Sequence, residues 1–326
     1  MIKFLIIRFS SIGDIVLTTP VIRCLKTQVE GAEIHYLTKT KFESIIEDNP
    51  YIDKIFTLER DFVSLQNKLK KEHYHYIIDL HRNLRTLRLK TRLKVLSFSF
   101  NKLNFKKWLI VNLKINKLPD IHIVDRYLKS VAIFDVKNDN NGLDYFIPDN
   151  EVVDISKINK ELHDGYIVFA IGAGHNTKQL PTDKAIALSS KIKYPVVLLG
   201  GKEDYQRGEL IVNSAAKKIF NYCGKFSINQ SASIIKQSRL VISHDTGLMH
   251  IAAAFKKRIL SIWGNTIPEF GMYPYLPAKD SHIIQVNGLS CRPCSKIGFK
   301  KCPKGHFKCM QEIDTDKVAE IANSSA

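Results

Sequence analysis

Three polar segments of the sequence have residue types and spacings suited to binding or acid–base chemistry, and each directly follows an apolar run. The first is Ser10-Ser11-Ile12-Gly13-Asp14. Gly13 permits a tight turn with close backbone approach, and Asp14 is a candidate general base. A helix N-terminus alone also explains an Asp here, because the helix dipole favours negative charge. Since that dipole lowers the carboxylate pKa, a base role requires apolar or closed surroundings.

The second segment is rich in small residues and ends in a lysine: Gly172-Ala173-Gly174-His175-Asn176-Thr177-Lys178. Small residues let backbone N–H groups approach phosphate oxygens, and Lys178 supplies a positive charge. The segment lacks both the third glycine of a dinucleotide-binding fingerprint and the Gly-Lys-Ser/Thr ending of a P-loop. Taken alone, it is better interpreted as a structural turn.

The third segment, Ser243-His244-Asp245-Thr246-Gly247-Leu248-Met249-His250, runs into an alanine-rich stretch that predicts a helix. Thr246 and Gly247 would present free N–H groups to a diphosphate at the helix N-terminus. Asp245 could cap the helix or accept a hydrogen bond from a ribose hydroxyl. His250 lies one turn further on the same face. The simpler alternative is a well-capped helix with a packed histidine.

Four of the six cysteines, Cys291, Cys294, Cys302 and Cys309, fall within 19 residues. Four thiolates could form a tetrahedral structural zinc site. Their spacing after the first pair is irregular for a zinc ribbon, so we favour reduced thiols in a local structural role, with zinc or a redox pair as alternatives.

The positive charge of the chain is concentrated in two windows. The sequence has 49 Lys and Arg against 32 Asp and Glu, a formal net charge of +17. Eleven basic residues and no acidic residue lie between His81 and Lys117, and six basic residues and no acidic residue lie between Ser281 and Gln311. Such patches attract nucleic acid, anionic lipid or a phosphorylated substrate. A solvated basic surface is the simpler alternative.

Composition and hydropathy exclude several classes of protein. A hydrophobic content of 44% argues against disorder. No apolar run approaches the ~20 residues that a membrane-spanning helix needs. Residues 1–8 resemble a first strand more than a signal peptide. We therefore expect a protein of the reducing cytoplasm.

Apolar runs alternate with helix-compatible stretches, which predicts an α/β fold with parallel sheets. The expected strands are Lys3–Arg8, Glu33–Leu37, Lys54–Thr57, Tyr76–Leu80, Lys94–Phe98, Tyr166–Ile171, Val196–Leu199, Lys218–Tyr222, Leu240–Ser243, Arg258–Trp263 and Ile283–Val286. The expected helices are Asp14–Thr27, Phe42–Glu47, Thr182–Ile192, Tyr205–Ala216, Ser231–Gln237, Gly247–Phe255 and Asp314–Ala322. Turn-forming residues around 138–150 predict two domains, 1–145 and 146–326.

Together, the motifs resemble one family. Residues 8–20, with the sequence RFSSIGDIVLTTP, are similar to the N-terminus of the heptosyltransferases, the family 9 glycosyltransferases. The segment from Asp245 to His250 is similar to the nucleotide-binding motif of that family. Lys178, the segment 199–204 and the turn 263–266 follow in the family's order, so the resemblance covers nearly the whole chain.

The resemblance implies a GT-B fold, in which two Rossmann-like domains face each other across a cleft. The first would bind the acceptor and the second the nucleotide sugar. The implied reaction is an inverting transfer of a heptose from ADP-heptose to the inner core of lipopolysaccharide, with Asp14 as general base. The implied nucleotide-sugar site comprises Gly172, Gly174, Thr177, Lys178, Asp245, Thr246, Gly247, Leu248 and His250. No metal cofactor is expected for catalysis, because Lys178 and a helix N-terminus can neutralise the diphosphate.

The lipopolysaccharide core is polyanionic and lies at a membrane surface, which suits an N-terminal domain with eleven basic residues in one window. The residues expected to bind the acceptor are Ser10, Ser11, Gly13, Arg85, Arg88 and Arg92. The expected partners are a nucleotide-sugar donor, the lipopolysaccharide core and the anionic inner membrane, with no nucleic acid. The expected location is cytoplasmic and peripheral on the inner membrane.

Two departures from the family pattern leave alternatives open. Ala173 and Gly174 stand where family members often carry hydroxyl residues. Thr177 or backbone N–H groups would therefore have to make the phosphate contacts of those hydroxyls. The family's common Gly-Pro-Thr turn is here Gly264-Asn265-Thr266. A related transferase with another nucleotide sugar or glycan acceptor is therefore the main alternative. Nucleic-acid binding is less favoured, because it would leave Asp14 and the segment 245–250 without a role. A dehydrogenase is disfavoured, because no complete Gly-x-Gly-x-x-Gly motif follows any expected strand.

Overall fold

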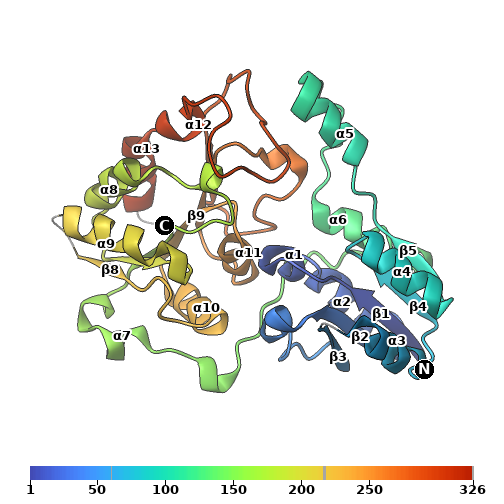
Figure 1. The fold of residues 1–326 in the computed structure, drawn as a ribbon. Helices are drawn as coiled ribbons and strands as arrows, with labels where there is room; N and C mark the ends of the chain where they lie inside the picture. Colours follow the sequence, from blue (N-terminus) through green and yellow to red (C-terminus); the bar gives the residue numbers. More distant parts are fainter. Residues whose placement is uncertain (60, 216–217, 325–326) are drawn as a thin grey trace. The chain divides into compact units, whose positions relative to one another are not determined.

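The computed structural model describes residues 1–59, 61–215 and 218–324. The chain forms two units (Figure 1): unit 1 comprises Met1–Lys102 and Ile121–Phe146, and unit 2 comprises Leu103–Asp120 and Ile147–Ala326. Residues 103–120, which the sequence-based division places in the first domain, therefore belong to unit 2. The physical reason is apolar packing, because Ile110 contacts the unit 2 residues Ile267 and Phe270.

Unit 1 is built on a five-stranded parallel sheet with the order β3-β2-β1-β4-β5. Its strands are β1 (Ile2–Ile7), β2 (Ala32–Lys39), β3 (Lys54–Leu58), β4 (Tyr76–Asp79) and β5 (Leu96–Ser99). Its helices are α1 (Ile12–Val16), α2 (Thr19–Gln28), η1 (Thr40–Ile45), α3 (Phe62–Lys70), α4 (Leu84–Leu93), α6 (Ile123–Leu128) and η3 (Ala132–Phe134). The strand order reverses between β1 and β4, and ligands of open α/β sheets bind at such a reversal.

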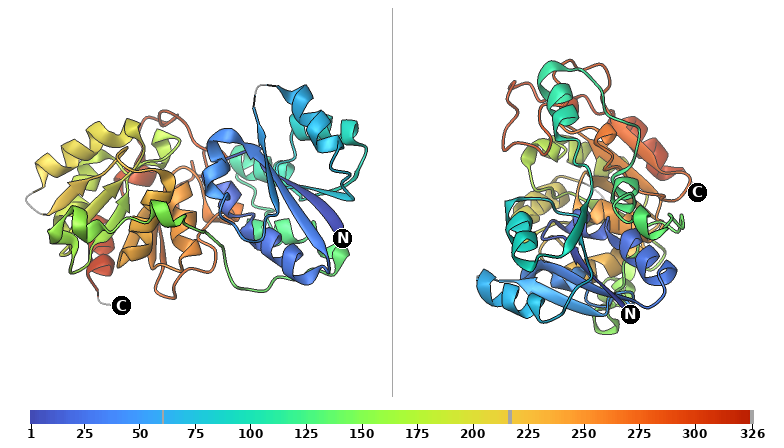
Figure 2. Two further views of the ribbon diagram at one scale, coloured as in Figure 1. Left: turned by 90° about the horizontal axis from the view of Figure 1, so that it is seen from below. Right: turned by 90° about the vertical axis from the view of Figure 1, so that its right-hand side faces the viewer.

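Unit 2 is built on a six-stranded parallel sheet with the order β11-β10-β9-β6-β7-β8. The strands are β6 (Ile167–Ala170), β7 (Val196–Leu199), β8 (Ile219–Asn221), β9 (Leu240–His244), β10 (Ile259–Trp263) and β11 (His282–Gln285). All residues of β6, β7, β9 and β10 are buried, as expected for strands that helices cover on both faces (Figure 2). In this sheet the order reverses between β6 and β9.

The longer helices of unit 2 are α8 (Thr182–Lys191), α9 (Tyr205–Ser214), α10 (Ile228–Gln237), α11 (Gly247–Ala254) and α13 (Thr315–Asn323). Shorter helices and turns are α5 (Asn104–Trp108), η2 (Leu109–Leu113), η4 (Asp149–Glu151), α7 (Ile155–Ile158), η5 (Lys160–Leu162), η6 (Asn176–Lys178), η7 (Lys202–Asp204), η8 (Pro268–Phe270) and α12 (Lys308–Gln311). Within the described ranges, no helix is long and apolar enough to cross a membrane.

All eleven expected strands are confirmed, with small shifts of their ends. The helix expected over Asp14–Thr27 is instead two helices, because α1 ends at Val16 and α2 begins at Thr19 with Pro20 in its first turn. The segment expected as a helix at 42–47 is the 3-10 helix η1. The helix expected over Tyr205–Ala216 ends at Ser214, and its last expected residue lies outside the described residues.

Candidate functional site

The loop after β1 fixes the Asp14 carboxylate between a buried arginine and a serine. Arg8 Nη2 lies 2.6 Å from Asp14 Oδ1, while the Ser11 hydroxyl donates to Asp14 Oδ2 at 2.8 Å. The Ser11 backbone N–H donates to the same oxygen at 3.2 Å. Arg8 is itself held by the Leu80 carbonyl and by the Tyr127 hydroxyl at 3.0 Å. Asp14 therefore occupies one fixed position at the carboxyl end of β1.

These contacts keep Asp14 ionised. Burial alone would raise its pKa, but the positive charge of Arg8 and the hydrogen bonds from Ser11 hold the pKa of Asp14 below its usual range. The Asp14 side chain still has 23% of its surface exposed, so a substrate hydroxyl can reach it. An ionised, accessible carboxylate can accept a proton from a hydroxyl that becomes acidic during attack.

Sequence reasoning missed two residues beside this carboxylate, His81 and Lys102. Burial, together with the charges of Arg8 and Lys102, lowers the pKa of His81 to about 4, so its imidazole is neutral at pH 7. Burial and Arg8 also lower the pKa of Lys102. His81 follows β4, the strand beside β1 at the reversal of strand order. Its position in the site was visible only once the strand order was known.

In unit 2, the second and third polar segments meet at the reversal between β6 and β9. Lys178 Nζ lies 2.6 Å from Asp245 Oδ2, and the Thr266 hydroxyl donates to the same oxygen at 3.0 Å. Asp245 therefore joins three loops, those after β6, β9 and β10. This contact fixes the Lys178 ammonium group beside the N-terminus of α11, where both can act on an anion.

The N-terminus of α11 is the most open part of the third segment. Asp245, Thr246, Gly247 and Leu248 are half-buried, whereas His250 is buried with 2% of its surface exposed. The first N–H groups of a helix have no partner within that helix, so those of α11 can donate to phosphate oxygens. The placement of His250 fits the packed-histidine alternative, and a nucleotide contact by His250 stays a prediction.

Two further side chains anchor the glycine loop between β6 and α8: His244, which lies in the third polar segment but had no predicted role, and Arg207, which sequence reasoning missed. The buried His244 accepts from the Leu180 N–H through Nε2 at 2.9 Å, and burial lowers the pKa of His244 to about 3. Arg207 of α9 donates to the Ile171 carbonyl at 2.8 Å and to the Leu180 carbonyl. Both ends of the loop are therefore held by side chains from outside the loop, the buried His244 and the half-buried Arg207.

The two predicted glycines of this loop have different surroundings. A Cβ at Gly172 would collide with Asp204 Oδ2, whereas a Cβ at Gly174 would meet nothing within 4 Å. Asp204 accepts from the Gly201 N–H at 2.9 Å, so Gly172 permits the loops after β6 and β7 to approach closely. Gly174 leaves open space where a ligand can approach the backbone.

Thr177 joins the glycine loop to the cysteine-rich segment. Its hydroxyl donates to the Phe299 carbonyl at 3.1 Å and accepts from the Phe299 N–H at 2.8 Å, and Thr177 is 2% exposed. The proposed replacement of a phosphate-binding hydroxyl by Thr177 therefore has no support in this geometry. Backbone N–H groups and Lys178 are left as the candidate phosphate donors of this loop.

The four clustered cysteines are free thiols in unit 2. Burial raises the pKa of Cys309 to about 12 and also raises that of Cys294. Across the described residues, no group of three or more His, Cys, Asp or Glu is arranged to hold a metal ion. The tetrahedral zinc alternative thus gains no geometric support and stays a prediction. Arg292, between the first two cysteines, donates to the Thr266 carbonyl at 2.8 Å and thereby supports the turn that holds Asp245.

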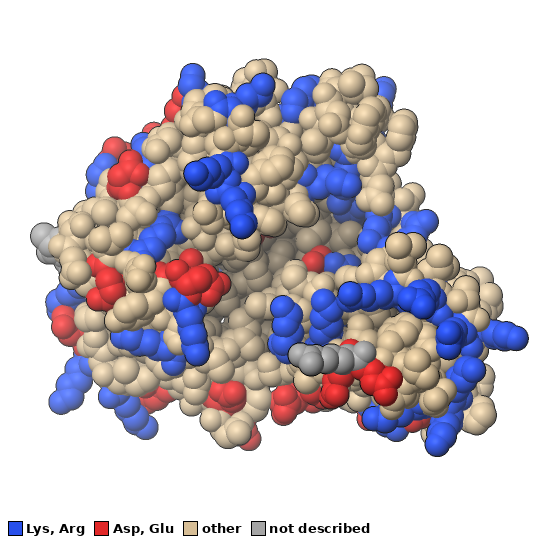
Figure 3. All heavy atoms as spheres, in the orientation of Figure 1, with Lys and Arg blue, Asp and Glu red and all other residues tan. Residues whose placement is uncertain are grey.

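The basic window 81–117 is divided between the two units. Arg85, Arg88 and Arg92 are exposed along one stripe of α4 in unit 1, while Thr86 and Leu89 on the other side are buried. Figure 3 shows Lys and Arg gathered over this part of unit 1. The last four basic residues, Lys106, Lys107, Lys114 and Lys117, belong to unit 2. The assignment of the whole window to an N-terminal acceptor domain is therefore wrong for these four.

Of the other expected acceptor residues, Ser10 is half-buried, Ser11 exposed and Gly13 buried.

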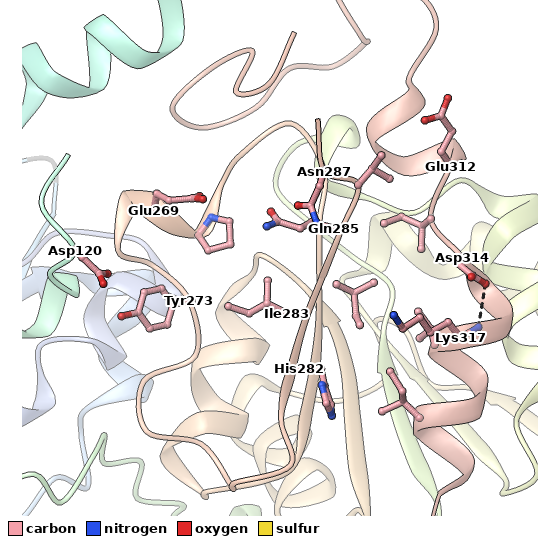
Figure 4. Close-up of a pocket in the computed structure, with 16 residues that line it drawn as sticks. Asp120, Glu269, Tyr273, His282, Ile283, Gln285, Asn287, Glu312, Asp314 and Lys317 are labelled. Carbon is pink, nitrogen blue, oxygen red and sulfur yellow. Dashed lines mark hydrogen bonds between the residues drawn. The ribbon is translucent and has the colours of Figure 1, made fainter. Parts of the chain in front are cut away.

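Unit 2 also contains a pocket of about 710 Å³ beside the edge strand β11 (Figure 4). It is lined by carboxylates, including Glu269 and Asp314, and by Lys317 of α13. None of the residues predicted to bind the nucleotide sugar lines this pocket. The site described above is therefore defined by the loops at the reversal of strand order.

Two Rossmann-like units with parallel sheets define the GT-B class of glycosyltransferases, and the polar groups lie at the strand ends where such folds bind ligands. The chain belongs to glycosyltransferase family 9 (heptosyltransferase), whose model matches residues 62–304.

Individual relatives agree with this assignment. The chain is 25% identical over 288 residues to lipopolysaccharide heptosyltransferase 1 of Campylobacter coli, which covers 81% of this chain and 84% of the relative. The structure of the present chain is similar to that of the glycosyltransferase family 9 protein of Veillonella parvula, with a TM-score of 0.77, 20% identity and coverage of 98% of this chain and 96% of that chain. It is also similar to the E. coli ADP-heptose lipopolysaccharide heptosyltransferase II, with a TM-score of 0.73, 18% identity and coverage of 99% and 98%.

Proposed function

We propose that this protein is an inverting heptosyltransferase that moves a heptose from ADP-heptose to the inner core of lipopolysaccharide. Its family membership supports a glycosyl transfer, and the Campylobacter relative is named for lipopolysaccharide. The E. coli structural neighbour is named for ADP-heptose. The observation that carries the proposal is the fixed pair Lys178–Asp245 at the N-terminus of α11.

The reaction needs a base for the acceptor hydroxyl and positive charge for the leaving diphosphate. Asp14 accepts the hydroxyl proton while the acceptor oxygen forms a bond to the anomeric carbon and the bond to ADP breaks on the opposite face. The configuration at that carbon is therefore inverted. Lys178 and the N–H groups of α11 balance the charge that develops on ADP, so no divalent cation is needed.

The acceptor and location follow from the same proposal. The exposed arginines of α4 bind the phosphates of the lipopolysaccharide core, with Ser10 and Ser11 next to the base. The protein acts at the cytoplasmic face of the inner membrane, where its basic surface is attracted to anionic lipid. A nucleotide-sugar donor and a hydroxyl acceptor give both Asp14 and Lys178 a role, whereas nucleic-acid binding would leave Asp14 without one.

A donor panel tests the proposal. The enzyme is incubated with ADP-heptose, ADP-glucose, UDP-glucose or GDP-mannose and with a truncated lipopolysaccharide core, and the product is identified by mass spectrometry. Transfer of heptose alone, with the inverted anomeric configuration by NMR, is expected. Transfer of another sugar would instead identify a related transferase, and loss of activity in EDTA that magnesium restores would contradict the metal-free account.

A further inference from the structure

Residues 103–120 form an arm of unit 2 whose two faces have different surroundings. On the inner face, Ile110 packs with Ile267 and Phe270, and Lys107 Nζ lies 5.4 Å from the centre of the Phe270 ring. Lys114 Nζ donates to the Pro293 carbonyl at 2.8 Å and to the Cys291 carbonyl at 3.3 Å. The inner face is therefore fixed to the body of unit 2 by apolar packing and by hydrogen bonds.

The outer face of the same arm exposes large apolar side chains. Phe105 is 71% exposed and Trp108 49% exposed, and their rings stack with centroids 6.4 Å apart. Leu113 and Ile115 continue the exposed apolar residues at 53% and 46%. Phe105 and Trp108 are three residues apart and so lie on one side of α5. Several exposed apolar side chains within one short segment, as here, are typical of an interaction surface.

Positive charge surrounds these apolar side chains. Lys106 and Lys117 belong to the arm, and the sequence contains no acidic residue from His81 to Lys117. The lysine-rich loop of the second basic window contributes exposed Lys296, Lys300 and Lys301. Figures 1 and 2 place this loop and α5 at the same end of unit 2, and the bonds from Lys114 join the two segments.

We propose that the outer face of the arm, Phe105, Trp108, Leu113 and Ile115, is the surface by which this protein inserts into an anionic lipid bilayer. A tryptophan favours the membrane–water interface, where its ring is partly buried and its N–H stays hydrated, and Phe and Leu supply apolar contact with the acyl chains. Flanking lysines contribute attraction to anionic headgroups. The inference rests on the proposed function, because the proposed acceptor is a membrane lipid, and it assigns the membrane contact to unit 2 rather than to the α4 arginines alone.

Trp108 provides a direct spectroscopic test. The chain has two tryptophans, and Trp263 is buried with 1% exposure, so a change in the environment of Trp108 dominates any change in emission. The full-length protein, without donor or acceptor, is titrated with vesicles of phosphatidylethanolamine and phosphatidylglycerol. A blue shift and quenching by lipids brominated on their acyl chains are expected. Unchanged emission on vesicles that sediment with the protein would overturn the proposal.

A matched pair of variants tests the surface itself. Phe105→Ser with Trp108→Ser should lower the vesicle partition coefficient about tenfold or more in a sedimentation assay, because two apolar contacts with lipid are lost. Ile158→Ser with Leu210→Ser removes two apolar side chains of unit 2 that are 50% and 57% exposed, and this control should bind as wild type. Equal binding by both variants would overturn the proposal. Dimerisation in the absence of lipid that the Phe105→Ser, Trp108→Ser variant abolishes would also overturn the proposal, because the outer face would then bind a second copy of the chain.

The outcomes for this surface and for the proposed function can be told apart. With a soluble truncated core as acceptor, the Phe105→Ser, Trp108→Ser variant should keep wild-type transfer. Loss of transfer with this soluble acceptor would show that the outer face binds acceptor, which contradicts the membrane assignment. Vesicle binding without any heptosyl transfer by the wild type would contradict the proposed function and leave the membrane assignment supported.

Discussion

At the residue scale, the site in unit 1 depends on the contact between Asp14 and Arg8. Their charged atoms are 2.6 Å apart, and the pair is held from the other side by Ser11 and Tyr127. The arginine makes Asp14 a weaker base than an isolated carboxylate, but it also fixes the oxygen that must meet the acceptor. For an acceptor hydroxyl that loses its proton late in the attack, the position of the carboxylate matters more than its basicity.

Replacing Asp14 by Asn should therefore preserve the fold and donor binding while lowering kcat about 10²–10⁴-fold, the usual contribution of a general base. The measurement is turnover at saturating donor and acceptor. His81→Gln is the matched comparison, since His81 is a neutral potential base in the same site. If Asp14→Asn turns over at the wild-type rate and His81→Gln does not, His81 is the base.

The pH dependence follows from the same two residues. Asp14 acts deprotonated and its pKa is lowered by Arg8, while the pKa of His81 is lowered to about 4. Neither group changes protonation between pH 5 and 8, so kcat/KM should be level across this range. Activity should fall only as the pH drops through about 4, where His81 becomes charged, and should fall further at the lower pH where Asp14 loses its charge. A fall centred near pH 6.5 would assign the titration to another group.

Lys178 carries the donor prediction. Losing a charge-assisted hydrogen bond to phosphate costs about 1.5–3 kcal/mol, so Lys178→Ala should weaken ADP binding by about ten- to a hundredfold in calorimetry. Lys191→Ala is the control, because Lys191 belongs to the same unit but pairs with Asp316 at the surface. Equal ADP affinity in both variants would remove Lys178 from the diphosphate site.

At the element scale, the strands could be predicted from the sequence because parallel strands covered on both faces are continuous apolar runs. The polar segments after β1, β6 and β9 could be predicted as well, because each begins where such an apolar run ends. The arm 103–120 was assigned to the wrong unit because its apolar residues do not reveal which core they join. Arg207 and the anchoring role of His244 were missed because the loop that these residues anchor is brought to them only by strand order.

The close approach of the loops after β6 and β7 gives a prediction at this scale. Gly172→Ala would place a methyl group against the Asp204 carboxylate, so either the glycine loop or the Asp204 side chain must shift, and we expect the loop to move because Asp204 is buried and bonded to the Gly201 N–H. We expect weaker donor binding with little change in the acceptor KM, because Lys178 lies in this loop. Gly174→Ala is the control for the fold, since its Cβ meets no protein atom within 4 Å. A Gly172→Ala variant with wild-type donor affinity would show that the loop tolerates the shift.

At the scale of the whole molecule, the net charge of +17 is not spread evenly. The α4 arginines lie in unit 1, whereas the lysines of the arm and of the second window lie in unit 2. The two groups can therefore serve different anions, phosphates of the glycan core in the first case and lipid headgroups in the second. Because screening acts over ~8 Å at physiological salt, both contacts should weaken as salt is added.

Changing Arg85, Arg88 and Arg92 together to Gln separates these roles. The three side chains are exposed on one stripe of α4, so the substitutions should leave the fold intact. We expect a higher KM for the phosphorylated core acceptor and a weaker dependence of that KM on salt, with vesicle binding close to that of the wild type. Donor affinity should stay constant, because the loops proposed to hold the donor belong to unit 2.

A second triple variant shows whether position or net charge is responsible. Lys41, Lys129 and Lys137 are exposed residues of unit 1 outside the basic window, and changing them to Gln removes the same three charges. If α4 binds the acceptor, only the arginine variant raises the acceptor KM, since a specific contact depends on where the charge lies. If both variants raise it equally, the general field of the molecule attracts the acceptor. An arginine variant that loses donor binding while its acceptor KM is unchanged would assign α4 to the nucleotide and contradict the division of roles between the two units.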